Sequence, residues 1–433
     1  MNILEIIAKK RDGKKLSKEE IYFFIENYTK GIVTDYQAAA LVMAIYINGM
    51  DYEETTNLTL AMANSGEVLD LRELGFVVDK HSTGGIGDKI TLILMPIIAS
   101  LGIPAAKMSG RGLGFTGGTI DKLESIPGYN TGISVEEFIN NVKNIGISII
   151  GQTLNLAPAD KKLYALRDTI SCVDNIPLIA SSVMSKKIAA GADRIVLEVT
   201  VGSGAFMKTI EEAKELSETM IGIGKLANKE TICVLTNMNE PIGHSIGNSL
   251  EIVEAIESLK GNMPDDIKDI ILELGSNMMK LAGKGDNDEE NKRIITEKIQ
   301  SGEALNKFKE LVQNQGGDVS YIDNPNKFEK AKYIMPVIAE KTAYVKAMHN
   351  DEIGLISCSL GAGRIRKEDS INNKVGIIVN KKIGDKVEAG EIIGYIHADD
   401  EQKGAEATKK LLECYEWSDE FVEKERPVIE IIR

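Results

Sequence analysis

Two glycine-rich segments carry the side chains best suited to hold an anion. The first, residues 80–88 (KHSTGGIGD), follows a short apolar run that predicts a strand and precedes an apolar helix. Glycines let the backbone turn tightly and leave several N–H groups free to point at one anion, and the helix N-terminus adds its partial positive charge. Lys80 supplies a full charge, and Ser82 and Thr83 supply hydroxyl donors. The pattern predicts an anion-binding loop between a strand and a helix.

The second segment, residues 107–124, contains the dinucleotide spacing Gly112-x-Gly114-x-x-Gly117. A dinucleotide turn should open a long helix, but Pro127 and Gly128 leave room for only a short one. The segment also has more donors than a pyrophosphate turn needs: Lys107, Ser109, Arg111, Thr116 and Thr119. We therefore favour a second anion loop over a nicotinamide dinucleotide site.

Two pairs of polar residues have helical spacing in a later segment. Tyr164 and Arg167 are three residues apart, and Ser182 and Lys186 are four apart, so each pair shares a helix face. Either these are solvated surface pairs or they form a binding wall that faces the glycine loops. His81, inside the first loop, could titrate near neutral pH, although a lone histidine is more often structural.

The composition excludes several classes of protein. The chain has 433 residues, of which 43% are hydrophobic and 27% charged, values typical of a globular protein. A formal net charge of −14 argues against a nucleic-acid partner. The longest uncharged run, residues 90–106, is too short for a membrane span, and the N-terminal segment has no signal-peptide pattern, so we expect no membrane partner. Four widely spaced cysteines predict reduced thiols and a cytoplasmic location.

The residues around these motifs predict a helical unit followed by an α/β unit. Residues 1–66 contain three helix N-cap signatures and no strand signal, and the signatures begin at Ser17, Thr34 and Asp51. Short apolar strands then alternate with helices, which predicts parallel α/β structure. The predicted strands are residues 76–78, 103–108, 147–150, 194–200 and 231–236. Residues 159–192 return to a helical pattern.

The last hundred residues have a different pattern of residue types. Short apolar runs and glycine-rich turns predict a β-rich, sandwich-like portion. Residues 383–398 look like a hairpin from a lipoyl- or biotinyl-type sandwich. A carrier arm would need a lysine in a Met-Lys-Met or Asp-Lys-Ala turn upstream, and residues 360–369 contain neither pattern. We therefore expect this portion to be purely structural.

Together these segments closely resemble the thymidine and pyrimidine-nucleoside phosphorylase family. The resemblance covers nearly the whole chain and rests on three segments in the family's order, which are residues 80–89, 109–128 and 159–193. It implies a discontinuous all-α domain (1–66 and 160–192), a large α/β domain (70–155 and 194–332) and a C-terminal part (333–433) packed on the latter. It also implies a cleft between the first two domains and a homodimer formed through the all-α domain.

The resemblance implies reversible phosphorolysis of pyrimidine nucleosides (uridine, thymidine and deoxyuridine) to free base and (deoxy)ribose 1-phosphate. Phosphate is then the co-substrate, the sugar passes through an oxocarbenium-like state, and no organic cofactor is expected. The implied catalytic residues are His81, Arg167 and Lys186. The implied phosphate-binding residues are Lys80, Ser82, Thr91, Lys107, Ser109 and Thr119. The implied base-binding residues are Tyr164, Arg167, Ser182 and Lys186.

A monovalent cation, K⁺, is implied as well, at Gly87, Lys89, Ile242, Ser245 and Glu254. Most of these residues would bind it through backbone carbonyls, and Lys89 brings a positive charge close to it. The sequence around Lys107 resembles the broad branch of the family, which accepts uridine and thymidine, whereas the strict thymidine branch usually lacks this lysine.

Three other readings stay open from the residues alone. The first is a strict thymidine phosphorylase. The second is a phosphoribosyltransferase of the related anthranilate type, which would need a pyrophosphate site and would not need the C-terminal sandwich. The third is a nucleoside- or phosphate-sensing module without catalysis, which would explain the two anion loops but not the pairing of Arg167 and Lys186 with His81.

Overall fold

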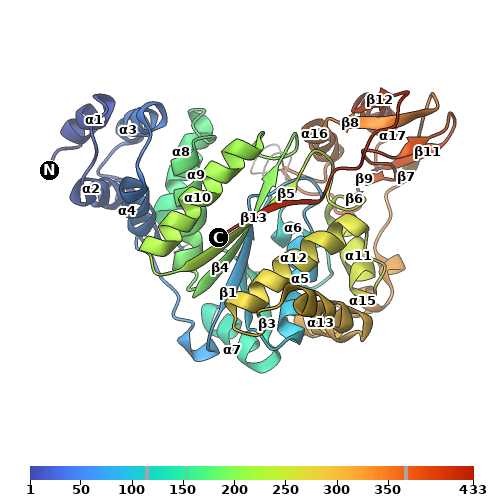
Figure 1. The fold of residues 1–433 in the computed structure, drawn as a ribbon, viewed down its shortest axis with the longest axis horizontal. Coiled ribbons are helices and arrows are strands. Elements are labelled where there is room, and N and C mark those ends of the chain that lie inside the picture. The colour runs from blue at the N-terminus through green and yellow to red at the C-terminus, as the bar shows by residue number, and fades with distance from the viewer. Residues whose placement is uncertain (113–116, 154, 365–368) are drawn as a thin grey trace.

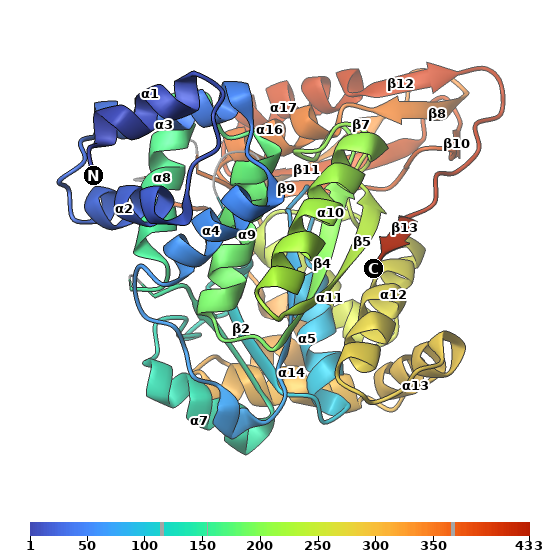
Figure 2. The same cartoon turned by 60° about the vertical axis from the view of Figure 1, so that its left-hand side comes forward.

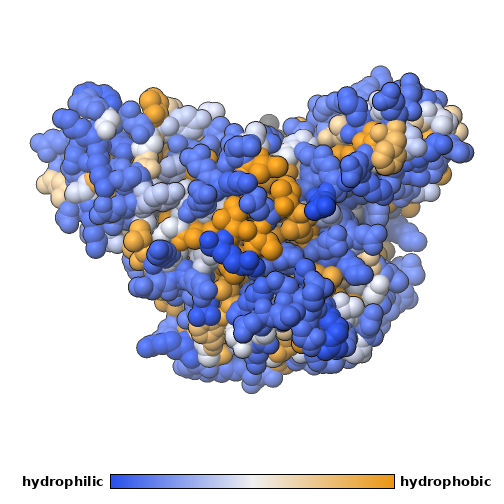
Figure 3. Space-filling model, in the orientation of Figure 1, coloured by the Kyte–Doolittle hydropathy of each residue, from blue (hydrophilic) through white to orange (hydrophobic). Residues whose placement is uncertain are grey.

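The computed structural model describes residues 1–112, 117–153, 155–364 and 369–433. It has a helical lobe, an α/β lobe and a C-terminal lobe rich in antiparallel strands (Figure 1). The predicted fold class, a discontinuous helical domain with a large α/β domain and a β-rich C-terminal portion, is confirmed. The exact domain boundaries remain a prediction. In the space-filling view the surface is hollowed between the N-terminal helices and the C-terminal lobe (Figure 3).

The helical lobe is built from two distant parts of the chain. Its helices are α1 (Ile3–Arg11), α2 (Lys18–Thr29), α3 (Asp35–Asn48), α4 (Tyr52–Ala63), α8 (Pro158–Thr169) and α9 (Ile176–Ala189). Apolar residues of both parts, such as Leu58 on α4 and Leu163 on α8, belong to one buried core. Figures 1 and 2 both show α8 and α9 beside α4. The returning helical pattern in the sequence therefore completes the first lobe.

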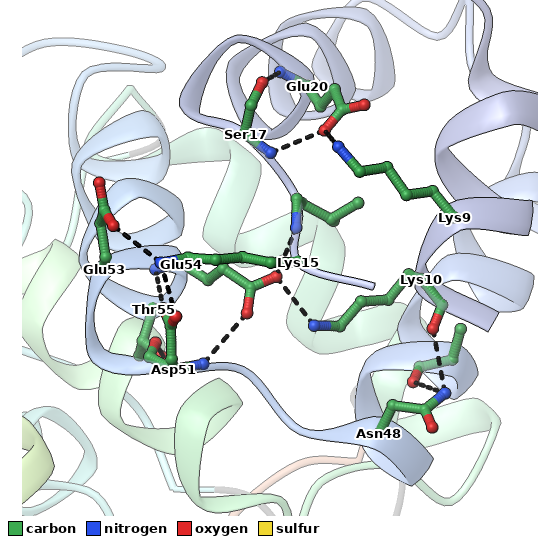
Figure 4. Close-up of polar contacts among 12 residues, drawn as sticks. Lys9, Lys10, Lys15, Ser17, Glu20, Asn48, Asp51, Glu53, Glu54 and Thr55 are labelled. Atoms are coloured by element: carbon green, nitrogen blue, oxygen red, sulfur yellow. Dashed lines mark hydrogen bonds and ion pairs between the residues drawn. The ribbon is translucent and has the colours of Figure 1, made fainter. Parts of the chain in front are cut away.

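Helix N-caps fix where these helices begin. The predicted caps at Ser17, Thr34 and Asp51 each form a capping box with a side chain three residues later. Glu54, the partner of Asp51, also accepts hydrogen bonds from the backbone N–H of Leu16 and from Lys10 Nζ, each at 2.8 Å. Figure 4 shows Lys10 pointing toward Glu54. Lys10 and Glu54 are both buried, so this ion pair joins α1 to α4.

The α/β lobe contains a four-stranded sheet in the order β1-β4-β5-β13. The strands are β1 (Val78–Ser82), β4 (Arg194–Val201), β5 (Glu230–Asn237) and β13 (Val428–Ile432). The first three are parallel, and β13 joins the edge antiparallel to β5. A parallel pair, β2 (Ala105–Ser109) and β3 (Ile147–Gly151), lies beside β1. Because β13 comes from the end of the chain, the last residues complete the α/β lobe.

Both faces of this sheet are covered by helices, as a parallel sheet requires. Side chains alternate between the faces along β4, so Ile195 and Leu197 face the core shared with α9 and α10 (Ile210–Leu226), whereas Val196 faces the opposite core. The helices on that opposite side are α5 (Ile90–Ser100), α11 (Asn248–Leu259), α12 (Asp265–Leu281), α13 (Asp288–Gln300) and α14 (Glu303–Asn314). Helix α7 (Val135–Ile145) and four short helical segments complete the lobe: η1 (Arg72–Leu74), α6 (Thr119–Leu123), α15 (Ser320–Asp323) and η2 (Pro325–Lys327).

The C-terminal lobe holds two antiparallel sheets, in the orders β10-β8-β12 and β6-β9-β11-β7. Its strands are β6 (Ser245–Ile246), β7 (Tyr333–Ile338), β8 (Ala343–Met348), β9 (Gly376–Val379), β10 (Lys386–Val387), β11 (Ile392–Ala398) and β12 (Tyr415–Ser418). Helices α16 (Asn350–Leu360) and α17 (Glu401–Glu413) pack with them. The hairpin predicted over residues 383–398 is wrong, because β10 pairs with β8 while β11 pairs with β7 and β9.

The first predicted strand is also displaced. The sequence pattern places it over residues 76–78, whereas β1 begins at Val78 and ends at Ser82. Two buried charged residues, Asp79 and Lys80, therefore lie inside a strand that an apolar pattern could not extend. This shift puts the first anion-binding candidates on the strand itself. Across the part of the chain that the structure describes, no helix combines the length and the apolar character needed to cross a bilayer.

Candidate functional site

The carboxyl end of β1 carries a fully buried ion pair. Because β1 and β4 are parallel, Ser82 at the end of β1 lies opposite Glu198, three residues before the end of β4. Lys80 Nζ lies 2.6 Å from Glu198 Oε2, and neither side chain is exposed. Burial opposes the charge on Lys80, but Glu198 and Asp88 outweigh it and raise the pKa of Lys80. Among the described residues Lys80 Nζ makes no hydrogen bond of good geometry, so this close contact with Glu198 is an ion pair between two buried groups.

A single carboxylate joins β1 to β2 and to α9. Asp79 Oδ1 lies 3.3 Å from Lys107 Nζ on β2, and Asp79 Oδ2 lies 2.6 Å from Lys187 Nζ on α9. Lys107 Nζ also donates to the backbone carbonyl of Lys80 at 2.6 Å. Burial would raise the pKa of Asp79, but the two lysines hold it below its usual value. We call Lys80, Lys107 and Lys187, with Asp79 and Glu198, the buried lysine cluster.

Within this cluster the pKa of Lys107 lies near neutral pH, so its charged and neutral forms are both populated there. Burial lowers the pKa of Lys107 to about 7, because the attraction of Asp79 does not compensate for burial and for the positive charges of Lys187 and Lys80. An anion bound beside Lys107 would favour its charged form and raise that pKa again. The cluster is therefore electrostatically incomplete until an anion arrives.

His81 lies on β1, directly after Lys80. Burial and the charges of Lys187, Lys107, Lys186 and Lys80 hold the pKa of His81 well below its usual value. His81 is therefore neutral at neutral pH, and it can offer a substrate a hydrogen bond from a neutral imidazole. The positive charge of Lys186 therefore also contributes to the low pKa of His81.

The second glycine-rich segment is held by one buried carboxylate. Asp121, on α6, accepts hydrogen bonds from Arg111 Nη1 at 3.1 Å, from the backbone N–H of Gly112 at 2.8 Å and from Arg364 Nη1 at 2.9 Å. Gly118 passes so close that an added Cβ would lie 2.0 Å from the nitrogen of Gly112. Gly114 and Thr116 of this segment lie outside the described residues.

The predicted phosphate-binding residues lie on neighbouring elements. Lys80 and Ser82 lie on β1, Lys107 and Ser109 on β2, Thr91 in the first turn of α5 and Thr119 at the start of α6. Lys122 joins α6 to the first loop, because its Nζ donates to the carbonyl of Asp88 at 2.5 Å and lies 2.7 Å from Glu251 Oε2. The structure thus brings together the segments that carry these hydroxyls and ammonium groups.

The predicted base-binding residues lie on α8 and α9. Lys186 Nζ donates to Ser182 Oγ at 2.8 Å, which confirms that the two side chains share a helix face, and it lies 2.7 Å from Asp160 Oδ2. The ring of Tyr164 lies 5.8 Å from Lys186 Nζ and 5.6 Å from Arg167 Cζ. The Lys186 side chain is 23% exposed, so its ammonium remains within reach of a ligand.

Arg167 has a structural task that its spacing did not suggest. Its guanidinium donates to the backbone carbonyls of Cys172 at 3.0 Å, Val173 at 2.6 Å and Leu178 at 3.1 Å, and the residue is buried. These bonds hold the turn between α8 and α9. Of the five N–H donors of an arginine, three are used in this way, which leaves two for a base.

The residues proposed for a monovalent cation also meet, but around a side chain. Lys89 Nζ donates to the carbonyls of Ile242 at 2.7 Å and Ser245 at 2.9 Å and to Glu254 Oε2 at 2.5 Å. Gly87 adjoins them, because an added Cβ there would lie 2.7 Å from the carbonyl oxygen of Ile242. Over the described residues, no group of three or more His, Cys, Asp or Glu side chains could hold a metal ion.

Sequence reasoning missed the acidic half of the site. Asp79 and Glu198 each stand inside an otherwise apolar strand, and a carboxylate in that position needs a buried cationic partner. This signal was present in the sequence, but it could not tell which lysine would supply the charge. Lys187 was missed for the same reason, and Asp160 and Asp121 carry no pattern that separates them from surface acids.

Three family descriptions match consecutive parts of the chain. Residues 4–66 match the helical bundle domain of the glycosyl transferase family, and residues 74–305 match the a/b domain of that family. Residues 344–418 match the C-terminal domain of pyrimidine nucleoside phosphorylases. These matches follow the three lobes of the structure in order.

Curated relatives match almost from end to end. Pyrimidine-nucleoside phosphorylase of Staphylococcus haemolyticus is 52% identical over 417 residues, which are 96% of each chain. The protein of the same name from Staphylococcus epidermidis is 53% identical over 92% of each chain. Among solved structures, anthranilate phosphoribosyltransferase from Thermus thermophilus aligns with a TM-score of 0.59 at 19% identity, over 72% of this chain and 99% of that one. That likeness is one of fold alone.

The pKa of Lys107 predicts that phosphate binding takes up a proton. At about pH 8 Lys107 is largely neutral in the free protein, and a bound phosphate dianion would restore its charge, so we expect uptake of up to about one proton per phosphate. Isothermal titration calorimetry in buffers of different ionisation enthalpy measures this uptake. The control is Lys107→Arg, whose cation cannot be deprotonated and which should bind without uptake. Equal heats in all buffers for the unaltered protein would contradict the prediction.

Proposed function

Since the chain belongs to the pyrimidine-nucleoside phosphorylase family, we propose that it catalyses reversible phosphorolysis of uridine, thymidine and deoxyuridine. The products are the free pyrimidine and ribose or deoxyribose 1-phosphate. The observation that carries this proposal is that Lys187 on α9 is paired with Asp79 of the buried lysine cluster, while the preceding residue, Lys186, contacts Ser182 and Asp160. An anion site and a separate cation are thus held close together, as a reaction between phosphate and a nucleoside requires.

The phosphate half of the reaction belongs to the lysine cluster. A phosphate oxygen forms a bond to the anomeric carbon while the glycosidic bond breaks, and the sugar carries positive charge as it passes between the two. Lys80 and Lys107 hold the phosphate, and Ser82, Ser109, Thr91 and Thr119 lie on the elements around it. The bound dianion stabilises the developing sugar cation, so no covalent enzyme intermediate is needed.

Residues of α8 and α9 stabilise the leaving base. The base departs with the electron pair of the glycosidic bond, so negative charge grows on the pyrimidine. Lys186 can stabilise that charge with its ammonium, and the two remaining donors of Arg167 can add hydrogen bonds. Tyr164 and Ser182 lie beside Lys186 and shape the same wall. His81 contributes a hydrogen bond from a neutral imidazole.

Three observations separate this function from its rivals. The match of residues 344–418 to a pyrimidine nucleoside phosphorylase C-terminal domain favours a phosphorylase over an anthranilate-type phosphoribosyltransferase, which would not need that part. Lys107 belongs to the buried lysine cluster, and its sequence context supports the broad branch over a strict thymidine phosphorylase. The pairing of Lys186 with Asp160 beside Tyr164 supports an enzyme over a sensor, because a sensor needs no stabiliser for a leaving group.

A homodimer through the helical lobe is part of the proposal. Helix α3 buries Leu41 and Ile45 against its own lobe but exposes Tyr36 and Ile47, which are 75% and 71% exposed. Ile32, just before the helix, is 66% exposed. These large apolar side chains on one lobe suit the matching surface of a second copy. A cytoplasmic location is also proposed, supported by four cysteines that are all free and buried.

The function predicts base release that depends on phosphate. Uridine and thymidine are each incubated with the protein, with and without phosphate, and the free base is followed by ultraviolet absorbance. We expect release from both nucleosides, only when phosphate is present. Release from thymidine alone would support the strict thymidine phosphorylase. No release from either, with activity on phosphoribosyl pyrophosphate, would support the transferase, and binding without turnover would support the sensor.

Adjacent lysines on α9 should differ in what they control. Lys186→Ala removes the stabiliser of the leaving base, so we expect kcat to fall by roughly 10²- to 10³-fold while the Kd for phosphate stays within about threefold. Lys187→Met instead removes a partner of Asp79 and should weaken phosphate binding and lower Tm. Steady-state kinetics, phosphate titration and thermal unfolding separate the two outcomes. Near-normal kcat in Lys186→Ala would exclude its proposed role.

The exposed face of α3 predicts the oligomeric state. Sedimentation velocity should find a dimer for the unaltered protein and a monomer for the double variant Tyr36→Glu and Ile47→Glu, because two carboxylates would be buried at the interface. Phe421, which is 74% exposed in the C-terminal lobe, gives the matched control Phe421→Glu, which should remain a dimer. A monomeric unaltered protein, or a dimer in the double variant, would place any interface elsewhere.

A further inference from the structure

The ammonium of Lys89 occupies the place where a monovalent cation would be held. Lys89 has no exposed surface, and its Nζ is surrounded by the carbonyl oxygens of Ile242 and Ser245 and by Glu254 Oε2, at 2.5 to 2.9 Å. Two carbonyls and a carboxylate are hard oxygen donors of the kind that bind alkali and alkaline-earth cations. Here all three accept hydrogen bonds from one lysine.

The residues present do not fit a potassium ion. Three of the oxygens that would coordinate K⁺, those of Ile242, Ser245 and Glu254, are already bonded to Lys89 Nζ, so the ion would have to lie within contact distance of a second positive charge. Burial makes that repulsion stronger than it would be in water. The carboxylate of Glu254 is also already neutralised: burial would raise its pKa, but Lys89 and two backbone N–H groups hold it below its usual value.

We propose that Lys89 is a built-in replacement for the monovalent cation, so that this protein needs no K⁺. The replacement is covalent: the side chain that carries the charge belongs to the residue directly after the first anion-binding loop. The effective concentration of such a cation does not depend on the salt in solution. The inference rests on the proposed function only for its kinetic test, because the structural role can be measured without substrate.

The cation position joins three segments that the site depends on. Lys89 is the N-cap residue of α5 and follows Gly87 and Asp88 of the first loop. Glu254, on α11, accepts hydrogen bonds from the backbone N–H groups of His244 at 2.8 Å and Ser245 at 3.0 Å. Ser245 begins β6, which pairs with β9 in the C-terminal lobe. One ammonium therefore ties the anion loop to α11 and to the C-terminal lobe.

The test compares Lys89→Thr with Lys89→Met. Threonine removes the ammonium and leaves the carboxylate and two carbonyls facing an open space, so a cation from solution can enter. Methionine keeps an unbranched chain of similar length without charge, so the space stays filled. Tm is measured for each protein at constant ionic strength in choline, lithium, sodium, potassium and rubidium chloride.

We expect the Tm of the unaltered protein to be the same in potassium and in choline. Lys89→Thr should have a lower Tm in choline, and potassium should raise it again by about 3 °C or more, in a saturable way. Lys89→Met should be destabilised and gain nothing from potassium. The double variant Lys89→Thr and Glu254→Gln should lose the rescue, because the carboxylate that attracts the cation is gone.

The kinetic arm measures kcat/KM for phosphorolysis by the unaltered protein in potassium and in choline, and we expect a ratio close to one. A rise of tenfold or more in potassium, or a potassium-specific rise in the Tm of the unaltered protein, would overturn the proposal. Absence of a potassium effect on a folded Lys89→Thr would overturn it as well. Should Lys89→Thr not fold, the unaltered protein alone decides. Lack of activity in every salt would refute the proposed function, while the Tm measurements would still test Lys89.

Discussion

The carboxylate of Asp79 is the interaction on which the candidate site depends. It pairs with Lys107, 28 residues away in the chain, and with Lys187, 108 residues away. Three segments that share no local sequence signal are thereby fixed to one point. Burying lysines is unfavourable unless each has a partner, so removal of this carboxylate would leave two ammonium groups in a region that water does not reach. The arrangement of β1, β2 and α9 follows from that requirement.

Burial is the main cause of the low pKa of Lys107, and the charges of Lys187 and Lys80 add to it while Asp79 opposes it. Lys80 is stabilised separately by Glu198 and Asp88. In the proposed reaction a phosphate dianion beside Lys107 would favour its charged form, inside a chain whose net charge of −14 otherwise repels anions. The proposed affinity for phosphate is thus a local property of buried groups. The acidic surface of the protein gives no sign of it.

The parts of the fold that sequence could predict are those governed by neighbours in the chain. The capping boxes at Ser17 and Asp51 and the alternation of strands and helices depend on spacings of a few residues, and they are confirmed. The pairing of β10 and β11 with different sheets depends on which distant strand lies beside each, and local apolar patterns suggested a hairpin instead. The continuation of β1 to Ser82 was missed because its buried charges interrupt the apolar pattern.

The candidate site divides in the same way. The glycine loops and the pair Ser182 and Lys186 were found because their residue types and spacing are local. Only the geometry could show that Arg167 donates three hydrogen bonds to backbone carbonyls around the turn between α8 and α9. Geometry alone could also show that Lys89 points its ammonium at the oxygens expected to hold a cation. In both cases the sequence identified the residue, and the direction of the side chain determined its task.

In the proposed reaction, helix α9 connects the phosphate-binding residues to the residues that stabilise the leaving base. It belongs to the helical lobe, yet Lys187 near its end is bonded to Asp79 on β1. Lys186 is the preceding residue and turns toward Asp160 and Ser182, because successive residues on a helix point in directions about 100° apart. The anchor at Lys187 therefore fixes the position of Lys186 relative to the phosphate lysines. In the proposed reaction, the spacing between the attacking phosphate and the stabiliser of the leaving base therefore depends on how α9 is held against β1.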